Sequence, residues 1–187
     1  MTNPSITIQQ GLLSNAAFKA SPNKNSRPNS DDIRLIILHG ISLPPDQFGG
    51  PWIDDFFLNN LDPDQHPYFQ EIYQMKVSSH LLIRRDGSLI QYVPFHERAW
   101  HAGLSTYKNE ENCNDFSIGI ELEGTDQIPY TDEQYQQLMV CCTSLIEHYP
   151  GLSKNTIVGH CDVSPGRKTD PGKSFDWLRF RASLSAF

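Results

Sequence analysis

Short apolar runs bounded by turn residues predict several strands. The run RLIILHG, which ends at His39 and Gly40, is continuous, as is typical of a strand buried on both faces. In VSSHLLIRRDGSLIQYVPF, two apolar segments flank Asp86 and Gly87, a preferred pair in hairpin turns, and so predict a hairpin. TIVGH reads as another short strand, and it too ends in a histidine, His160.

The segment DFSIGIELEG alternates with a period of two, which predicts a strand with two different faces. One face is apolar and is expected to pack in the core; it carries Phe116, Ile118, Ile120 and Leu122. The other face combines small residues with two acids, which leaves room above it; it carries Ser117, Gly119, Glu121 and Glu123.

Two segments have the period of a helix. TDEQYQQLMVCCTSLIEHYP repeats apolar residues at helical spacing, begins with a capping box of Thr131 and Gln134, and ends at Pro150. FDWLRFRASL predicts a final amphipathic helix with Asp176 in its first turn. Because strands and helices are mixed, the expected fold class is α/β in a mixed α+β arrangement, a central mixed β-sheet flanked by helices.

Two stretches follow neither period. Residues 1–30 end in SPNKNSRPNSDD and predict an irregular N-terminal arm on the surface. Residues 42–76 contain paired Pro, paired Gly and several aromatic residues, too many for a disordered segment. We expect this long insertion to hold a short helix around WIDDFFLNN and to wall a pocket. The length suits one domain over residues 1–187.

Composition and charge narrow the possible partners. The net charge of −7 argues against nucleic acid, because phosphate binding needs a basic face. The N-terminus lacks a basic segment followed by an apolar run, and no stretch is long enough to span a bilayer. We therefore expect a cytoplasmic protein with no membrane partner. The four cysteines form no CxxC pair and predict free, mostly buried thiols.

Two of the seven histidines, His39 and His160, stand at strand ends, where an open sheet exposes side chains to a crevice. With Asp170, on a loop shaped by Pro and Gly, they form a donor set that suits a catalytic zinc. Spacing alone leaves a second interpretation open, in which both histidines are hydrogen-bonded core residues. Cys161 adjoins His160 in a segment read as extended, so its side chain is expected to turn away from the site, into the core.

Other polar residues have a functional and an ordinary interpretation. Glu121 could act as a general base, or it could belong to a solvated pair of acids. Lys168, two residues before Asp170, could stabilise an oxyanion, or it could be a surface lysine. His101, in AWHAG, could contact a substrate or merely pack against Trp100.

Six segments taken in order resemble a known family: LIILHGISLPP, the hairpin, AWHAG, NDFSIGIELEGT, YTDEQYQQL and GHCDVSPGRKTDPGKSFDW. They are similar to the zinc N-acetylmuramoyl-L-alanine amidases of the amidase-2/peptidoglycan-recognition-protein superfamily. SLPPDQFGGPWID and HPYF resemble its cytoplasmic branch, the AmpD-type 1,6-anhydro-N-acetylmuramyl-L-alanine amidases. The resemblance covers about residues 33–180, and the ordered combination is far more specific than any one motif.

The resemblance implies an amidase-like fold and a single zinc amidase domain, whose 42–76 insertion walls the substrate groove. The implied reaction is zinc-dependent hydrolysis of the amide between (1,6-anhydro-)N-acetylmuramic acid and L-alanine of muropeptides, in cytoplasmic peptidoglycan recycling. The implied zinc ligands are His39, His160 and Asp170. The implied catalytic residues are Glu121 and Lys168. The expected partner is an anhydromuropeptide bound by a monomer, through Tyr68, Lys76, Trp100, His101 and Asn114.

Three positions depart from that branch: Gly40 replaces a common Asn, Lys76 a common Arg, and Asn112 a common basic residue. They affect substrate contacts more than the chemistry. A stem peptide rich in carboxylates further predicts a locally positive groove, with candidates Lys76, Arg84, Arg85, Arg98 and Arg167.

Three alternatives remain open at this point. The chain could be a module that binds or senses peptidoglycan fragments without cleaving them. The metal could serve only to stabilise the fold. The enzyme could also be a broader amidase that accepts muropeptides without the anhydro sugar.

Overall fold

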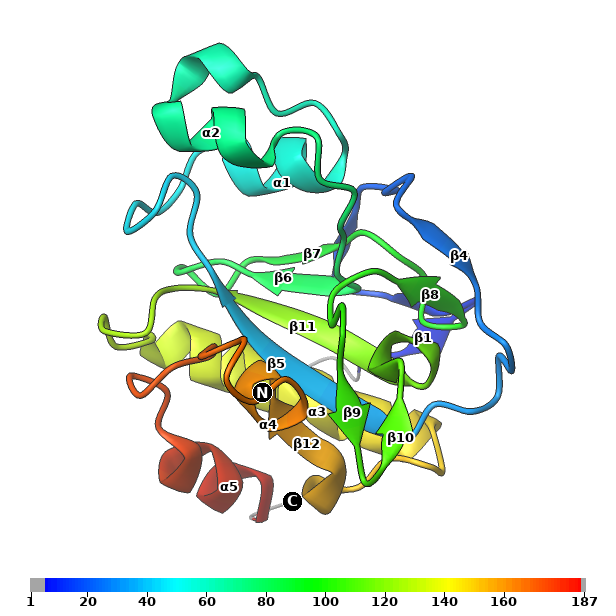
Figure 1. Cartoon of the computed structure of the whole chain (residues 1–187). Coiled ribbons are helices and arrows are strands. Elements are labelled where there is room, and N and C mark those ends of the chain that lie inside the picture. Colours follow the sequence, from blue (N-terminus) through cyan, green and yellow to red (C-terminus); the bar gives the residue numbers. More distant parts are fainter. Residues whose placement is uncertain (1–5, 186–187) are drawn as a thin grey trace.

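A six-stranded mixed sheet forms the centre of the molecule (Figure 1). The computed structural model describes residues 6–185. The strand order is β12 (Ile157–Gly159), β5 (Leu35–Ile41), β11 (Ser117–Glu123), β6 (Leu81–Ile83), β7 (Leu89–Gln91) and β3 (Ala17–Phe18). The first four strands are parallel, whereas β7 runs antiparallel to β6. This confirms the predicted mixed α/β fold.

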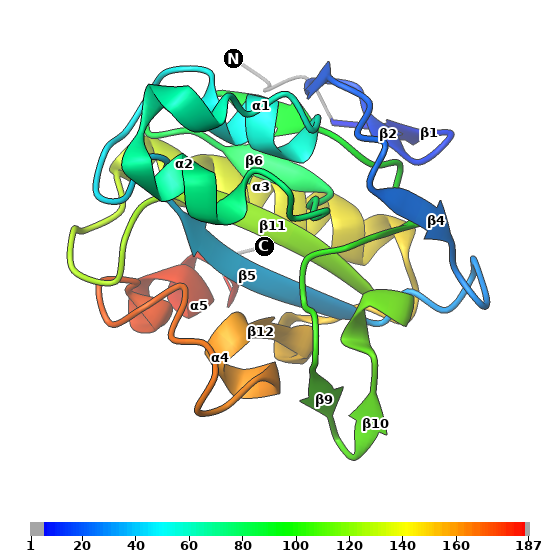
Figure 2. The same ribbon diagram turned by 45° about the horizontal axis from the view of Figure 1, so that its top comes forward.

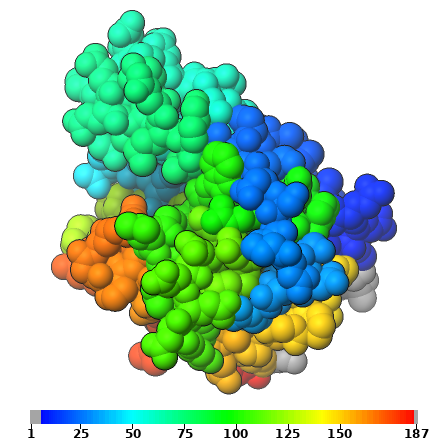
Figure 3. Space-filling model, turned by 45° about the vertical axis from the view of Figure 1, so that its right-hand side comes forward, coloured from blue at the N-terminus to red at the C-terminus, as the bar shows by residue number. Residues whose placement is uncertain are grey.

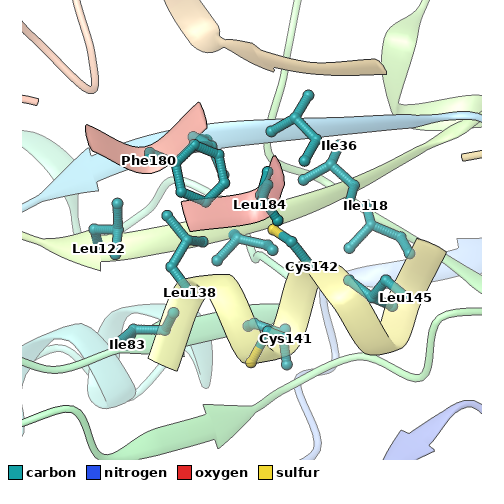
Figure 4. Close-up of a cluster of buried hydrophobic side chains, with 14 of the residues drawn as sticks. Ile36, Ile83, Ile118, Leu122, Leu138, Cys141, Cys142, Leu145, Phe180 and Leu184 are labelled. Atoms are coloured by element: carbon teal, nitrogen blue, oxygen red, sulfur yellow. The ribbon is translucent and has the colours of Figure 1, made fainter. Parts of the chain in front are cut away.

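Helices α3 (Asp132–His148) and α5 (Trp177–Ser185) cover one face of the sheet (Figures 1 and 4). The core between these helices and the sheet is apolar. It includes Ile36, Ile118, Leu122, Leu138, Cys142, Leu145, Phe180 and Leu184. The predicted capping box at Thr131 and Gln134 is present. Asp176 precedes α5, and its carboxylate accepts the N–H of Arg179 at 2.9 Å. Both predicted helices are therefore confirmed, with Asp176 just before the first turn.

The predicted hairpin is confirmed as β6 and β7, and Gly87 takes a positive φ in the connection between them. The alternation of β11 is also confirmed for Ile118, Ile120 and Leu122, which share the core beneath α3. Phe116 was wrongly assigned to that face. It follows the 3-10 turn η2 (Cys113–Asp115), outside the extended strand, and packs in another cluster with Leu35 and Ile37.

The N-terminal arm is more regular than predicted. Within residues 6–30, β1 (Ile8–Gln9) and β2 (Leu12–Leu13) form a small hairpin, and β3 joins the main sheet beside β7. β4 (Lys24–Ser26) pairs with β8 (Glu97–Ala99). The prediction of an irregular arm was wrong because strands of two or three residues have no readable period, and pairing with distant segments decides their conformation.

The 42–76 insertion contains α1 (Trp52–Phe57), where a short helix was predicted, the 3-10 turn η1 (Pro63–Gln65) and α2 (Pro67–Ile72). Helices α1 and α2 lie on the face of the sheet opposite α3 (Figure 2). They pack over β6 and β7 through side chains that include Ile53, Phe57, Phe69, Leu82 and Ile90. Figure 3 shows the insertion as a lobe with a hollow between it and the C-terminal segment near residue 165.

The remaining elements are short. β9 (Thr106–Tyr107) and β10 (Glu110–Glu111) form a hairpin at the side of the sheet, the 3-10 turn η3 (Lys154–Thr156) precedes β12, and α4 (His160–Val163) follows it. No helix within residues 6–185 has the length and apolarity to cross a membrane.

Candidate active site

The adjacent strands β5 and β12 bring two histidines together. The strands are parallel, and Leu38 lies opposite Gly159, so His39 and His160 follow as neighbours at the carboxyl edge of the sheet. Both side chains are buried, and their Nδ1 atoms lie 3.0 Å apart. The predicted convergence of two imidazoles from neighbouring strand ends is therefore present.

Asp170 completes a triangle of donor atoms. Its Oδ2 lies 3.2 Å from Nδ1 of His39 and 3.1 Å from Nδ1 of His160. Backbone contacts hold the loop, since Cys161 N–H donates to Asp170 O at 3.0 Å. Tetrahedral zinc with bonds of about 2.0–2.1 Å has ligand atoms about 3.3–3.4 Å apart, so the triangle matches one face of that geometry. The residues present fit a zinc ion, and they form the His/Cys/Asp/Glu group within residues 6–185 that could hold a metal.

The prediction that His160 lies in an extended segment was wrong, because His160 begins helix α4. The Asp162 carboxylate caps the start of this helix by accepting the N–H of Gly159 at 2.7 Å. Cys161 is therefore one helical step away and not on the opposite face of a strand. It is only half-buried and belongs to none of the apolar clusters among the described residues. The expectation that Cys161 packs in the core was wrong, although it stays outside the donor triangle.

The second nitrogen of each imidazole also has a partner. His160 Nε2 lies 3.0 Å from the carbonyl oxygen of Ala102, and His39 Nε2 lies 2.9 Å from Nδ1 of His101. Asn114 fixes this backbone, because its Oδ1 accepts the N–H groups of His101 and Ala102 at 3.1 and 2.8 Å. Such partners orient metal-binding histidines and set their tautomer.

Glu121 stands beside the triangle, opposite His39 in the register of β11 and β5. It is 8% exposed. Burial raises the pKa of Glu121 well above its usual value; the charge of Asp170 acts in the same direction and that of Lys168 opposes it. Lys168 is exposed and lines the same cavity. The structure thus brings both predicted catalytic residues to the donor triangle.

The ionisation of the triangle suits a metal. Burial lowers the pKa of His39 to about 4, against the opposing influence of Asp170, so its imidazole is neutral at neutral pH. Burial would raise the pKa of Asp170, but its hydrogen bonds to His160 and His39 outweigh this and lower the pKa far below the usual range. Neutral imidazoles and an ionised carboxylate are the forms that bind metal ions.

A cavity of about 380 Å³ opens onto these groups. The insertion contributes much of its wall, including Leu43, Phe56, Phe57, Tyr68, Ile72 and Met75. Of the five predicted substrate contacts, Tyr68, Trp100 and His101 line this cavity. Lys76 and Asn114 do not, and Asn114 instead holds the 101–102 backbone.

The cavity is not lined by the predicted cluster of cations. Within residues 6–185, Lys168 is its one lysine or arginine, whereas three carboxylates, Asp46, Glu121 and Asp170, line it. The four candidate arginines are engaged elsewhere: Arg84 with Asp54 and Glu123, Arg85 with Pro129 O, Arg98 with Asp115, and Arg167 with the carbonyls of Ala102 and Leu104. The prediction of a locally positive groove was wrong, because carboxylates and backbone carbonyls outside the cavity take these guanidinium groups.

Two features that support the histidines of the site were not predicted from the sequence. The Ala102 carbonyl partner of His160 is a backbone atom, and no side-chain pattern indicates it. Gly119 lies beneath His101, where an added Cβ would come within 2.5 Å of the imidazole ring. The alternation in β11 indicated space above Gly119, and the His101 ring occupies it.

Comparison with known proteins gives a consistent result. A family model described as N-acetylmuramoyl-L-alanine amidase matches residues 29–173. The chain is 56% identical over 180 residues to the 1,6-anhydro-N-acetylmuramyl-L-alanine amidase AmpD of Escherichia coli K12, covering 96% of this chain and 98% of that protein.

Two solved structures extend the comparison. The chain is similar to the crystal structure of a Se-Met AmpD derivative, with a TM-score of 0.93, 54% identity and coverage of 96% of this chain and 99% of the other. It is also similar to the amidase AmiD of Escherichia coli, solved in complex with the substrate anhydro-N-acetylmuramic acid-L-Ala-D-gamma-Glu-L-Lys. There the TM-score is 0.59 and the identity 26%, with coverage of 97% of this chain and 66% of the other.

Proposed function

The chain belongs to the N-acetylmuramoyl-L-alanine amidase family and is an enzyme of that family, and from this premise we propose its substrate and mechanism. The proposed reaction is hydrolysis of the amide between 1,6-anhydro-N-acetylmuramic acid and L-alanine of a muropeptide. The names of relatives that match nearly the whole chain support this choice. The observation that carries it in the structure is the convergence of three metal-binding donor atoms beside a buried glutamate, inside one cavity.

We propose that His39, His160 and Asp170 bind zinc through the atoms that form the triangle. Bound there, zinc supplies a Lewis acid for the amide carbonyl and lowers the pKa of its water ligand. The protein's own contribution is to hold both imidazoles in place and to keep that of His39 neutral. His160 is oriented by the Ala102 carbonyl, at 3.0 Å.

Glu121 is the proposed general base. Its burial raises its proton affinity, which favours taking a proton from the attacking water and passing it to the leaving L-alanine amine. Lys168 lines the same cavity and carries a flexible ammonium, which we propose stabilises the oxyanion of the transition state. In this proposal Glu121 transfers the proton and Lys168 stabilises the developing negative charge.

Tyr68, Trp100 and His101 are the proposed substrate contacts within the cavity, and Lys76 is proposed to contact the substrate from outside it. Asn114 is proposed to act indirectly, through the backbone of residues 101–102. We further propose one zinc amidase domain over residues 1–187, acting as a monomer in cytoplasmic peptidoglycan recycling without nucleic-acid or membrane partners. Size-exclusion chromatography and cell fractionation test these last points.

Incubation with an anhydromuropeptide, followed by mass spectrometry, tests the main proposal. The zinc-loaded enzyme is expected to release a free stem peptide and the anhydromuramyl sugar, and a chelator is expected to abolish the release. A zinc-loaded protein that binds the muropeptide without cleaving it would instead be a binding module. Unchanged activity of the Glu121→Gln and Lys168→Ala variants would indicate a purely structural metal. Parallel assays with the non-anhydro muropeptide measure how strictly the sugar is selected.

A further inference from the structure

We propose that His101 is a positioning residue that holds His39 in the one tautomer able to bind zinc through Nδ1. This inference rests on the proposed zinc site. Its starting point is the 2.9 Å contact between His101 Nδ1 and His39 Nε2. At that distance one nitrogen donates and the other accepts, so the tautomers of the two rings are coupled.

The direction of this hydrogen bond follows from the donor triangle. A nitrogen that binds a metal carries no proton, so a neutral His39 that uses Nδ1 must carry its proton on Nε2. That N–H points at His101 Nδ1, which must then present a lone pair. His101 in turn carries its proton on Nε2, which lies 3.4 Å from Ser117 Oγ, at the edge of hydrogen-bonding distance.

The His101 ring is held rigidly enough to act in this way. Its backbone N–H donates to Asn114 Oδ1 at 3.1 Å. The ring rests on Gly119, where a Cβ would come within 2.5–2.7 Å of three ring atoms. Below, the N–H of Gly119 donates to Nδ1 of the fully buried His80 at 3.0 Å, which fixes this part of the strand. The absence of a side chain at Gly119 therefore permits the contact with His39.

The two histidines of the triangle are supported by different kinds of partner. His160 donates to the Ala102 carbonyl, which no side-chain substitution removes, whereas His39 depends on a side chain. Removing the His101 acceptor leaves the His39 Nε2–H without this partner and makes the Nδ1–H tautomer, which cannot bind zinc through Nδ1, more competitive. Loss of an outer partner of this kind typically lowers metal affinity by about 10–100-fold.

The positioning role goes beyond two simpler roles for His101: a filler of the cavity wall, and the substrate contact proposed above, with which it is compatible. A filler depends on the volume of the ring. A substrate contact leaves zinc affinity unchanged in the absence of substrate. A positioning acceptor depends on a lone pair at one defined place, three bonds from Cα.

Zinc affinity without substrate, measured by competition with a chromogenic chelator, separates these roles. In His101→Asn, Oδ1 occupies the position of the imidazole Nδ1, so we expect zinc affinity within about threefold of wild type. In His101→Leu, the branched side chain lacks an acceptor, and we expect affinity to fall by roughly 10–100-fold. His148→Leu, at an exposed and distant site, is the matched control and is expected to bind zinc as wild type does.

Each result has one reading. Wild-type affinity in His101→Leu overturns the positioning role, and equal losses in the Leu and Asn variants assign the effect to ring volume and also overturn it. A wild-type protein that binds no zinc overturns the proposed function itself. Should His101→Leu fail to fold, nitrogen-15 NMR of zinc-loaded wild type decides: the proton must lie on His39 Nε2, and a proton on His101 Nδ1 overturns the proposal.

Discussion

Two buried clusters of titratable side chains lie at the carboxyl ends of the parallel strands, and their charges are arranged in opposite ways. In the metal-site cluster of His39, His160 and Asp170, three potential acceptor atoms converge within 3.2 Å of one another. In the second cluster, here called the anchor cluster, Asp54 and Glu123 surround the guanidinium of Arg84 at 2.9 and 3.2 Å. The first arrangement needs a cation from outside, and the second contains its own.

The anchor cluster has further donors for its two carboxylates. Asp54 also accepts from Lys19 Nζ at 3.0 Å and from the Tyr92 hydroxyl, and Glu123 accepts the N–H of Gly49 at 2.7 Å. Burial would raise the pKa of Asp54, but the donors from Tyr92 and Lys19 lower it. Because Asp54 belongs to α1 and Glu123 to β11, this cluster ties the insertion to the sheet.

The contrast between the clusters shows that burial of a charge does not by itself mark a reactive site. Glu121 and Glu123 share a face of one strand and are both buried, at 8% and 2% exposure. Glu121 faces the cavity with a raised pKa, whereas Glu123 is surrounded by donors. What distinguishes them is compensation, since a paired buried acid is stable and an unpaired one is a candidate base.

Substitution of a proposed ligand in the metal-site cluster should reduce activity more than any other change. Asp170→Asn should abolish stable zinc binding and lower turnover by roughly three orders of magnitude, about 4 kcal/mol of transition-state stabilisation. Metal analysis after dialysis and an assay of stem-peptide release measure both. Asp176→Asn, at the start of α5, serves as the control and should retain zinc and activity. Full zinc occupancy in Asp170→Asn would exclude the aspartate as a ligand.

The next effect separates the two glutamates by their chemistry. Glu121→Gln should lower turnover by about 10²–10⁴-fold while zinc remains bound, because the base is lost and the ligands are kept. Glu123→Gln, the matched substitution two residues away, should leave the folded, zinc-loaded enzyme within about tenfold of wild-type turnover. Comparable losses in both variants would show that position on this face, and not the base, accounts for the effect.

Substitutions at the same two positions should change the free energy of unfolding in opposite directions. Removing one partner of a buried ion pair costs about 3–5 kcal/mol, so Glu123→Ala should lower the free energy of unfolding by about 3 kcal/mol, and Glu123→Gln by somewhat less. Glu121 has a raised pKa in the folded state, so its stabilising contribution is present at low pH and is lost as pH rises through that pKa.

In Glu121→Gln the side chain carries no charge at any pH, so the variant does not lose stability as pH rises through the pKa of Glu121. The metal-free variant should therefore be more stable than metal-free wild type at neutral to alkaline pH, with a difference that shrinks on acidification. Urea unfolding of the metal-free proteins between pH 5 and 8 measures it. A destabilised Glu121→Gln protein at pH 8 would mean that the carboxylate is compensated after all.

The smallest effect concerns one hydrogen bond of the anchor cluster. Tyr92→Phe removes a donor to Asp54 and should cost about 1–2 kcal/mol of unfolding free energy at neutral pH. Because the folded-state pKa of Asp54 is lowered, the stability that it contributes is lost as pH falls through that pKa. The gap between wild type and Tyr92→Phe should therefore narrow below about pH 4 in acid titrations of unfolding. A gap that is independent of pH would assign the cost to packing.

Sequence patterns predicted the parts of this molecule that depend on local periodicity. The continuous apolar run before His39, the alternation of β11 and the capped helix α3 each determine their own conformation over several residues. Because the carboxyl ends of parallel strands meet at one edge of the sheet, the strand-end histidines also pointed to a shared site.

Other features depend on partners that the sequence does not identify. The arginines were expected in the groove, but which acid takes a guanidinium follows from packing, as Asp54 does for Arg84. The start of a helix at His160 depends on the Asp162 carboxylate, two residues later, which accepts the N–H of Gly159, and this changed the direction of Cys161. The contact of His101 with His39 joins two segments 62 residues apart, and no local pattern encodes it.

The pairing of β5 with β12 also determines when the donor triangle can form. His39 and His160 are 121 positions apart, and closing so long a loop costs entropy before any contact offsets it. Synthesis reaches His39 first and Asp170 131 residues later, so a nascent chain that stops before β12 holds one of the three donors. The donor triangle can therefore form only after the segment through Asp170 has been made and β12 has paired with β5.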